Sequence, residues 1–348
     1  MFGVGRLNWM AAIRLAGGIC LLSQAAEGQS PPASGPARPA IVSVMSVDVN
    51  AAQAEPQPAK ACLGGGQLLA AISAATGGEA AWELRCGKLV LGSGLARLDA
   101  LGRGLASVTL PDVRARAEAT LSVAHAGKAG SRRLDILPAA MLRDVRATLA
   151  DRGLGLMDAR GLVQAAMKAQ DVAFTDLRPQ LENDFFRGGI VILAGFDDPN
   201  MLAAACDKMA GRVRQGMSLL VLNPPAGWEA LGVRRTELAA AKSQVRMARG
   251  LASTIREADL GPCELTSALK ANRDAEAVVW FETRGGTKGG GPAAKHPLVL
   301  SRPLEKGVVL VAVLPQLTDC YTDPVGRCML SEIMMWILKR SQGPKEQK

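Results

Sequence analysis

The sequence predicts a small antiparallel β-sandwich followed by an α/β domain with a mostly parallel sheet. Residues 62–133 contain short runs of alternating apolar and polar residues, bounded by Gly or Pro, and this pattern is typical of antiparallel strands. From residue 134 onward, segments with strand and helix patterns alternate to about residue 340. This alternation favours parallel strands with helices on both faces of the sheet.

A strand–helix–strand unit is the clearest signal in the chain. Gly189–Gly195 and Met217–Leu222 are apolar runs, and Met201–Arg214 between them has helical periodicity. Strands that are apolar on both faces are expected in a parallel sheet. The second run ends at Asn223-Pro224-Pro225, where many folds of this kind hold a nucleophile.

The other predicted elements follow in chain order. In the first domain, AWELRCGKLVLGSGLARL predicts a hairpin that turns at Cys86–Gly87, and two more alternating runs follow. The α/β elements are a strand at 134–138, a helix at 139–153, a strand and turn at 153–163, a helix at Glu237–Arg249, a strand at 275–283, a hairpin at 298–315 turning at Glu305-Lys306-Gly307, and a closing helix at 323–340.

The N-terminus is interpreted as a secretory signal peptide, residues 1–25. Arg6 and Arg14 precede the apolar stretch Leu15–Leu22, and Ser23-Gln24-Ala25 suits cleavage. The stretch is shorter than the roughly 20 residues of a membrane-spanning helix, and no later segment could span a membrane, so we expect export to the periplasm or beyond; an uncleaved short anchor is the alternative.

Two further segments have linker or tail composition. Residues 26–61 are predicted to be a Pro/Ala-rich linker, in which Ile41–Val49 could add a strand to the first domain, and residues 342–348 are a basic tail. The sandwich is therefore assigned to residues 62–133 and the α/β domain to residues 134–341.

Composition argues against several classes of function. The net charge is +9, but no run alternates Lys or Arg with aromatics, so we expect no nucleic-acid partner. Aromatic residues are only 3% of the chain, which is low for a sugar-binding face.

The cysteines indicate no metal site. No Cys or His spacing is typical of a metal site, and we expect no cofactor. Cys320 and Cys328 are the candidate disulfide, with Cys62 and Cys86 the next pair, while Cys206 is predicted to be a buried apolar residue on a helix.

Several phrases together resemble a known family. They are GGIVILAG, RVRQGMSLLVLNPP, GWEALG, EKGVVLVAVLP and DPVGRCML followed by MMWIL, preceded by EAAWELRCGKLVLGSGLARL and ASVTLPDVRARAEATLSVAH. Residues 62–340 resemble the β-sandwich and class I glutamine-amidotransferase-like domain at the C-terminal end of secreted bacterial glycoside hydrolases of the family 2 and β-galactosidase kind. The resemblance implies a flavodoxin-like second domain that acts in assembly. The chain has no room for the catalytic barrel of those hydrolases.

Amidotransferase chemistry is not expected. That family places a Cys on the turn after a strand, with a His and an acid later in the chain, whereas this chain has Asn223-Pro224-Pro225 there. Two prolines cannot supply the amide donors of an oxyanion hole. The two histidines are His125 in the first domain and His296.

Four residues are candidates to face a ligand: Asp197, Asp198, Asn223 and Trp228. Asp197 and Asp198 follow a parallel strand, at the edge where α/β folds bind ligands. The alternative for Asp198 or Asn200 is to cap the helix that starts near Pro199. Trp228 follows the next strand.

Two other features have a structural interpretation beside a functional one. The Gly-rich loop Arg284–Gly291 could hold a phosphate, but a surface loop is favoured because the P-loop order is missing. The apolar stripe Met329–Leu338 is expected to pack on the sheet, with a subunit interface as the alternative.

The function expected from these observations is that of a non-catalytic accessory or interaction protein in an exported carbohydrate-degradation system. It would act by self-association as a homo-oligomer or by binding a partner such as a secreted glycoside hydrolase. The alternatives are a hydrolase of unrecognised type, which uses carboxylates at the strand ends, and a periplasmic ligand sensor.

Overall fold

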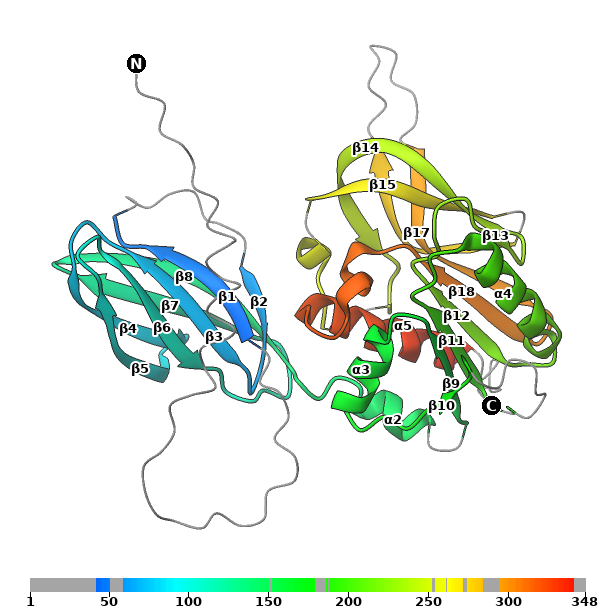
Figure 1. The fold of residues 1–348 in the computed structure, drawn as a ribbon, viewed down its shortest axis with the longest axis horizontal. Helices are drawn as coiled ribbons and strands as arrows, with labels where there is room; N and C mark the ends of the chain where they lie inside the picture. The colour runs from blue at the N-terminus through cyan, green and yellow to red at the C-terminus, as the bar shows by residue number, and fades with distance from the viewer. Residues whose placement is uncertain are drawn as a thin grey trace, which may run out of the picture. The chain divides into compact units, whose positions relative to one another are not determined.

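The structure, a computed structural model, describes residues 42–50, 59–149, 152–178, 186, 188–251, 254–260, 262–271, 274–283 and 294–340. Within these residues the fold is dominated by strands, which form one eight-stranded and one ten-stranded sheet (Figure 1). The predicted signal peptide, the Gly-rich loop Arg284–Gly291 and the basic tail lie outside the described residues, as do residues 26–41 and 51–58 of the predicted linker. In the part of the chain that is described, no helix has the length and apolar character needed to cross a bilayer.

The eight-stranded sheet is nearly closed on itself, and the prediction of a small β-sandwich is wrong. The strands run in the order β1-β3-β6-β5-β4-β7-β8-β2, and β1 also contacts β8 and β2 across the seam. Alternating residues point into a single interior. Alternation reveals half-buried strands but cannot distinguish one curled sheet from two packed sheets. The strands are β1 Val42–Asp48, β2 Lys60–Leu63, β3 Gln67–Ser73, β4 Gly78–Cys86, β5 Leu89–Leu98, β6 Arg103–Thr109, β7 Ala117–His125 and β8 Lys128–Leu137.

One strand of this sheet comes from the predicted linker. β1 pairs in parallel with β3, with Val44 opposite Leu69 and Val47 opposite Ile72. Its residues alternate between exposed and buried, and Met45 and Val47 point into the core. The expectation that Ile41–Val49 adds a strand to the following domain is therefore confirmed.

The ten-stranded sheet is mixed, which makes the flavodoxin-like prediction for the second domain wrong as well. β10, β9, β11, β12 and β18 are parallel neighbours, while β17, β16, β14 and β13 continue the sheet antiparallel, and β15 pairs with β14. The strands are β9 Leu154–Asp158, β10 Thr175–Asp176, β11 Ile190–Ala194, β12 Ser218–Leu222, β13 Glu229–Ala230, β14 Val233–Met247, β15 Pro262–Ala271, β16 Glu276–Thr283, β17 Ala294–Leu304 and β18 Gly307–Ala312.

The antiparallel half contains the largest error in the predicted elements. The sequence predicts a helix at Glu237–Arg249, but the residues of this segment up to Met247 belong to the long strand β14. ELAAAKSQVRMAR is rich in helix-forming residues, and pairing with β15 and β16 outweighs that weak local preference. The hairpin of β17 and β18 and the strand–helix–strand unit are confirmed.

Helices cover both faces of the parallel strands. Every residue of β11 and β12 is buried, and α4 and α5 both contact β12 and β18, from opposite sides of the sheet in Figure 1. The apolar stripe Met329–Leu338 of α5 is buried in this core, so its expected packing on the sheet is confirmed. The helices are α2 Arg143–Leu149, α3 Leu162–Ala169, α4 Pro199–Arg214 and α5 Pro324–Arg340, with short 3₁₀ turns η2 Glu257–Leu260 and η3 Pro315–Asp319.

A buried guanidinium joins three distant segments of the chain. Arg116, just before β7, donates hydrogen bonds to both Asp135 of β8 and Asp259 of η2, with Nη2 2.9 Å from Asp259 Oδ1 and Nε 3.2 Å from Asp135 Oδ1. The three side chains are 10%, 6% and 9% exposed. Burial opposes the charge on Arg116, but its bonds to Asp259 and Asp135 outweigh this effect and raise its pKa.

We predict that Arg116→Gln destabilises the fold by about 3–5 kcal/mol, because it leaves two buried carboxylates without their counter-charge. Urea unfolding measures the loss. Arg114→Gln is the matched control, since Arg114 is exposed two residues away and should change the unfolding free energy by less than about 0.5 kcal/mol. Equal effects of the two substitutions would show that the buried cluster does not stabilise the fold.

Candidate functional site

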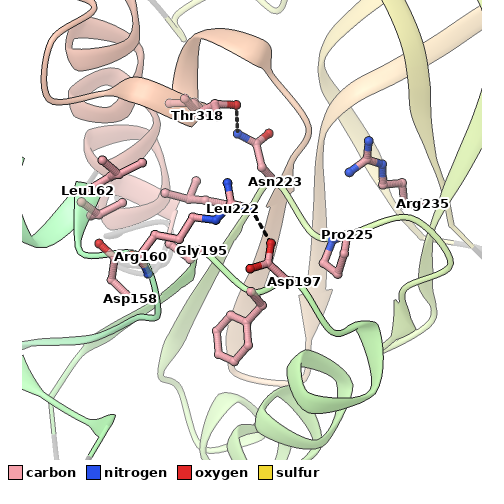
Figure 2. A pocket seen from close by; sticks show the side chains of 14 residues that line it. Asp158, Arg160, Leu162, Gly195, Asp197, Leu222, Asn223, Pro225, Arg235 and Thr318 are labelled. Carbon is pink, nitrogen blue, oxygen red and sulfur yellow. Dashed lines mark hydrogen bonds and ion pairs between the residues drawn. The ribbon is translucent and has the colours of Figure 1, made fainter.

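The candidate site is a pocket at the carboxyl ends of the parallel strands. Its volume is about 240 Å³. Residues that follow β9, β11 and β12 line it, and η3 and β14 complete the wall (Figure 2). This is the edge of a parallel sheet at which ligands generally bind.

Asp158, at the end of β9, holds the turn into α3. The residue is 3% exposed. Its Oδ1 accepts hydrogen bonds from the backbone N–H groups of Arg160, at 3.2 Å, and Gly161, at 3.0 Å, and its Oδ2 accepts one from Gln164 at 3.0 Å. A carboxylate that accepts three backbone bonds is engaged in positioning the chain.

Gly195, after β11, allows the two strand ends to approach each other closely. Its φ of 73° is in the left-handed region. An added Cβ would lie 2.7 Å from Arg160 N and 2.9 Å from Asp158 Oδ1. Only glycine therefore fits this wall of the pocket without a shift of the backbone.

The adjacent carboxylates Asp197 and Asp198 have different roles. Asp197 lines the pocket and forms an exposed ion pair with Arg160 (Figure 2). Asp198 is the N-cap of α4: its Oδ1 accepts a hydrogen bond from Asn200 N at 2.8 Å, and Pro199 occupies the first turn. The capping interpretation of Asp198 is confirmed, and Asp198 does not line the pocket.

Asn223 directly follows β12, at the carboxyl edge of the parallel strands. Its backbone has φ 45°, a left-handed conformation that Asn tolerates better than most residues. Its N–H donates to Ala312 O at 2.7 Å, and its Nδ2 donates to Thr318 Oγ1 at 3.2 Å. An amide thus stands at this position, followed by Pro224 and Pro225, which have no N–H to donate.

Arg235 is one of the site residues that the sequence did not point to, along with Asp158, Arg160 and Thr318. It reaches the pocket from β14 and donates from Nη1 to Pro224 O, while its buried Nε has no hydrogen-bond partner in the part of the chain that is described. Burial lowers the pKa of this guanidinium. Arg235 could not be recognised as a pocket residue in the sequence, because the segment that follows it has a helical composition. Only the alternation of a strand would have placed it beside the end of β12.

Trp228 is in the core and not in the pocket. It is 1% exposed, so the structure does not place it where a ligand could stack. In α4, Cys206 is fully buried as expected, and burial raises the pKa of its thiol to about 12.

The remaining candidates lie elsewhere. Cys320 and Cys328 are both fully buried, and their pairing stays a prediction. His125 hydrogen-bonds Thr76 and Glu79 O, and His296 stacks on Phe281. Among the described residues, no group of three or more His, Cys, Asp or Glu side chains is placed to hold a metal ion.

No protein-family model and no functionally curated protein matches this chain. Solved structures of glycoside hydrolases are weakly similar. The exo-β-1,4-mannosidase Op5Man5 from Opitutaceae bacterium strain TAV5 has a TM-score of 0.31 and 14% identity, over 54% of this chain and 36% of that one. The β-galactosidase from Bacillus circulans sp. alkalophilus has a TM-score of 0.31 and 13% identity, over 58% of this chain and 33% of that one.

The chain therefore spans about a third of the length of either hydrolase. The similarity is too slight to assign an activity, and no comparison bears out an amidotransferase-like domain.

We predict that Asn223→Ala destabilises the fold by about 1–2 kcal/mol, because it removes the bond to Thr318 and places Ala at positive φ. Asn223→Gly keeps the backbone freedom and loses only the side-chain bond, so it should cost less. Thermal unfolding of both variants separates the two contributions. Equal losses would show that the left-handed backbone contributes nothing to the cost.

The two acidic residues should respond differently to substitution. Asp198→Ala removes the N-cap of α4 and is expected to cost about 1 kcal/mol, whereas Asp197→Ala breaks only an exposed ion pair and should cost less than about 0.5 kcal/mol. Chemical denaturation measures both. The reverse order would contradict the capping role of Asp198.

Proposed function

We propose that this chain is a non-catalytic accessory protein of an exported carbohydrate-degradation system, which acts by binding at its strand-end pocket and by association with itself or a partner. The proposal of export rests on the signal-peptide pattern in the sequence. The link to carbohydrate degradation rests on the phrases that resemble secreted glycoside hydrolases. The binding role comes from the pocket.

The observation that carries the proposal is the chemistry of Asn223-Pro224-Pro225. A nucleophile at this edge needs a Cys, Ser or comparable group, a base beside it and donors for the developing oxyanion. Here the side chain at the strand end is an amide held by Thr318, and the two following residues have no N–H. The lining residues include no Cys, Ser or His, and their one hydroxyl, that of Thr318, accepts a hydrogen bond from Asn223 and has no base in contact with it among the described residues.

A hydrolase that uses the strand-end carboxylates fits the contacts less well. Asp158 is engaged by three backbone N–H groups, Asp197 pairs with Arg160, and Asp198 caps α4 outside the pocket. A general base must reach the proton it removes, and each of these carboxylates already has a positioning partner. The contacts support a pocket that binds a molecule without converting it.

A periplasmic ligand sensor is the second candidate function. The pocket is the observation that favours it, because a sensor needs a specific site and no catalytic group. The two functions differ in the effect of ligand binding on assembly. An accessory protein should be associated with itself or its partner whether the pocket is filled or empty, while a sensor should change its association when the ligand binds.

We predict that the full chain does not accelerate release of ammonia from glutamine or of nitrophenol from nitrophenyl galactoside and mannoside above the rate with heat-unfolded protein. The reason is the lack of a nucleophile beside a base in the pocket. Turnover that Asp197→Asn abolishes, while Asp207→Asn on α4 leaves it unchanged, would contradict the non-catalytic proposal.

Light scattering over a dilution series tests self-association in the same preparation.

A further inference from the structure

We infer that the strand-end pocket binds a small hydroxylated carboxylic acid, such as a sugar acid, through the guanidinium of Arg235. The inference deepens the proposed binding function and rests on it. It names the chemical class of the ligand and the residue that recognises its charge.

Arg235 is a half-buried cation at the pocket. Among the described residues its one hydrogen bond is to the Pro224 carbonyl and its Nε has no partner. Of the nearby carboxylates, Asp158 is engaged by backbone N–H groups and Asp197 by Arg160. Exposed Glu237 acts on Arg235 through its charge, and the described residues include no hydrogen bond or ion pair between the two. A partly desolvated cation without a carboxylate partner gains stability from a bound anion.

Most of the backbone N–H groups around the pocket that could bind an anion are already engaged. Phosphate sites are commonly built from free backbone N–H groups at a helix N-terminus. Here Asp158 accepts three of the N–H groups at the start of α3, those of Arg160, Gly161 and Gln164, while Asp198 accepts one at the start of α4 and Pro224-Pro225 has none. The guanidinium groups of Arg160 and Arg235 are the charged donors in the lining, and their planar fork matches a carboxylate.

Other groups of the pocket can contact the uncharged part of the ligand. Asn223 uses its Nδ2 group on Thr318 Oγ1, which leaves the Asn223 Oδ1 acceptor and the Thr318 hydroxyl proton available to ligand hydroxyls. Phe196, Leu222 and Leu317 supply an apolar wall. Figure 2 shows Asn223 between Arg160 and Arg235, so polar and charged groups meet in one small space.

The pocket is small. A volume of about 240 Å³ is below the roughly 300–1,000 Å³ of pockets for drug-sized ligands. A single sugar ring or a shorter hydroxy acid fits this scale, and a long oligosaccharide would have to extend outside. A monosaccharide acid is therefore the suitable probe.

The test is titration calorimetry of the full chain with D-galacturonate, D-galactose and inorganic phosphate, at one pH and ionic strength. We expect galacturonate to bind about tenfold or more tightly than galactose, because only galacturonate offers a carboxylate to the Arg235 guanidinium. Arg235→Gln should remove that preference and Arg235→Lys should restore part of it. Arg234→Gln is the matched control, because Arg234 is the exposed neighbour on the opposite face of β14.

The comparison of galacturonate with galactose on the unchanged protein does not depend on any variant folding correctly. Equal binding of the two sugars, binding of phosphate in preference to galacturonate, or no binding of galacturonate would each overturn the inference. Loss of binding in Arg234→Gln equal to that in Arg235→Gln would overturn the role of Arg235. These outcomes differ from failure of the proposed function, which would be detected as turnover of a substrate.

Discussion

The need to cover both faces of β11 and β12 governs the arrangement of the second half of the chain. These strands have no solvent-facing side, so helices must lie on each face, and α4 and α5 do so. Burial of both faces leaves the strand ends as the place where polar side chains can meet. The pocket is therefore a consequence of the sheet: Asp158, Gly195 and Asn223 each lie at the end of a strand whose other residues are committed to the core.

At this edge of the sheet, the two halves contribute different groups to the pocket. Asn223 adopts the left-handed turn at the strand end, but its amide is tied to Thr318 and two prolines follow. Arg235 then adds a charge from the antiparallel half of the sheet, through its bond to the Pro224 carbonyl. The parallel half supplies the shape of the pocket, and the antiparallel half supplies this guanidinium.

Sequence reasoning succeeded where local patterns determine structure. The strand–helix–strand unit, the hairpin at Glu305-Lys306, the cap at Asp198 and the strand within Ile41–Val49 follow from periodicity and turn residues. It failed where long-range pairing decides. Closure of the first sheet, β14 in place of a helix, and hence the position of Arg235 depend on partners that lie far away in sequence. Of the residues expected to face a ligand, Asp197 and Asn223 line the pocket. Trp228 is instead in the core, because a tryptophan after a strand can turn inward or outward.

The parallel pairing of β1 with β3 has a consequence for processing of the protein. β1 is a sheet edge in the middle of a segment with the composition of a linker, and residues on both sides of it are rich in Pro and Ala. Proteolytic trimming that stopped before Val42 would leave the curled sheet intact. Trimming beyond Asp48 would strip β3 of its neighbour and expose a row of unpaired backbone groups, which is a template for aggregation. Removal of Val42–Asp48 would therefore lower the solubility of the first sheet.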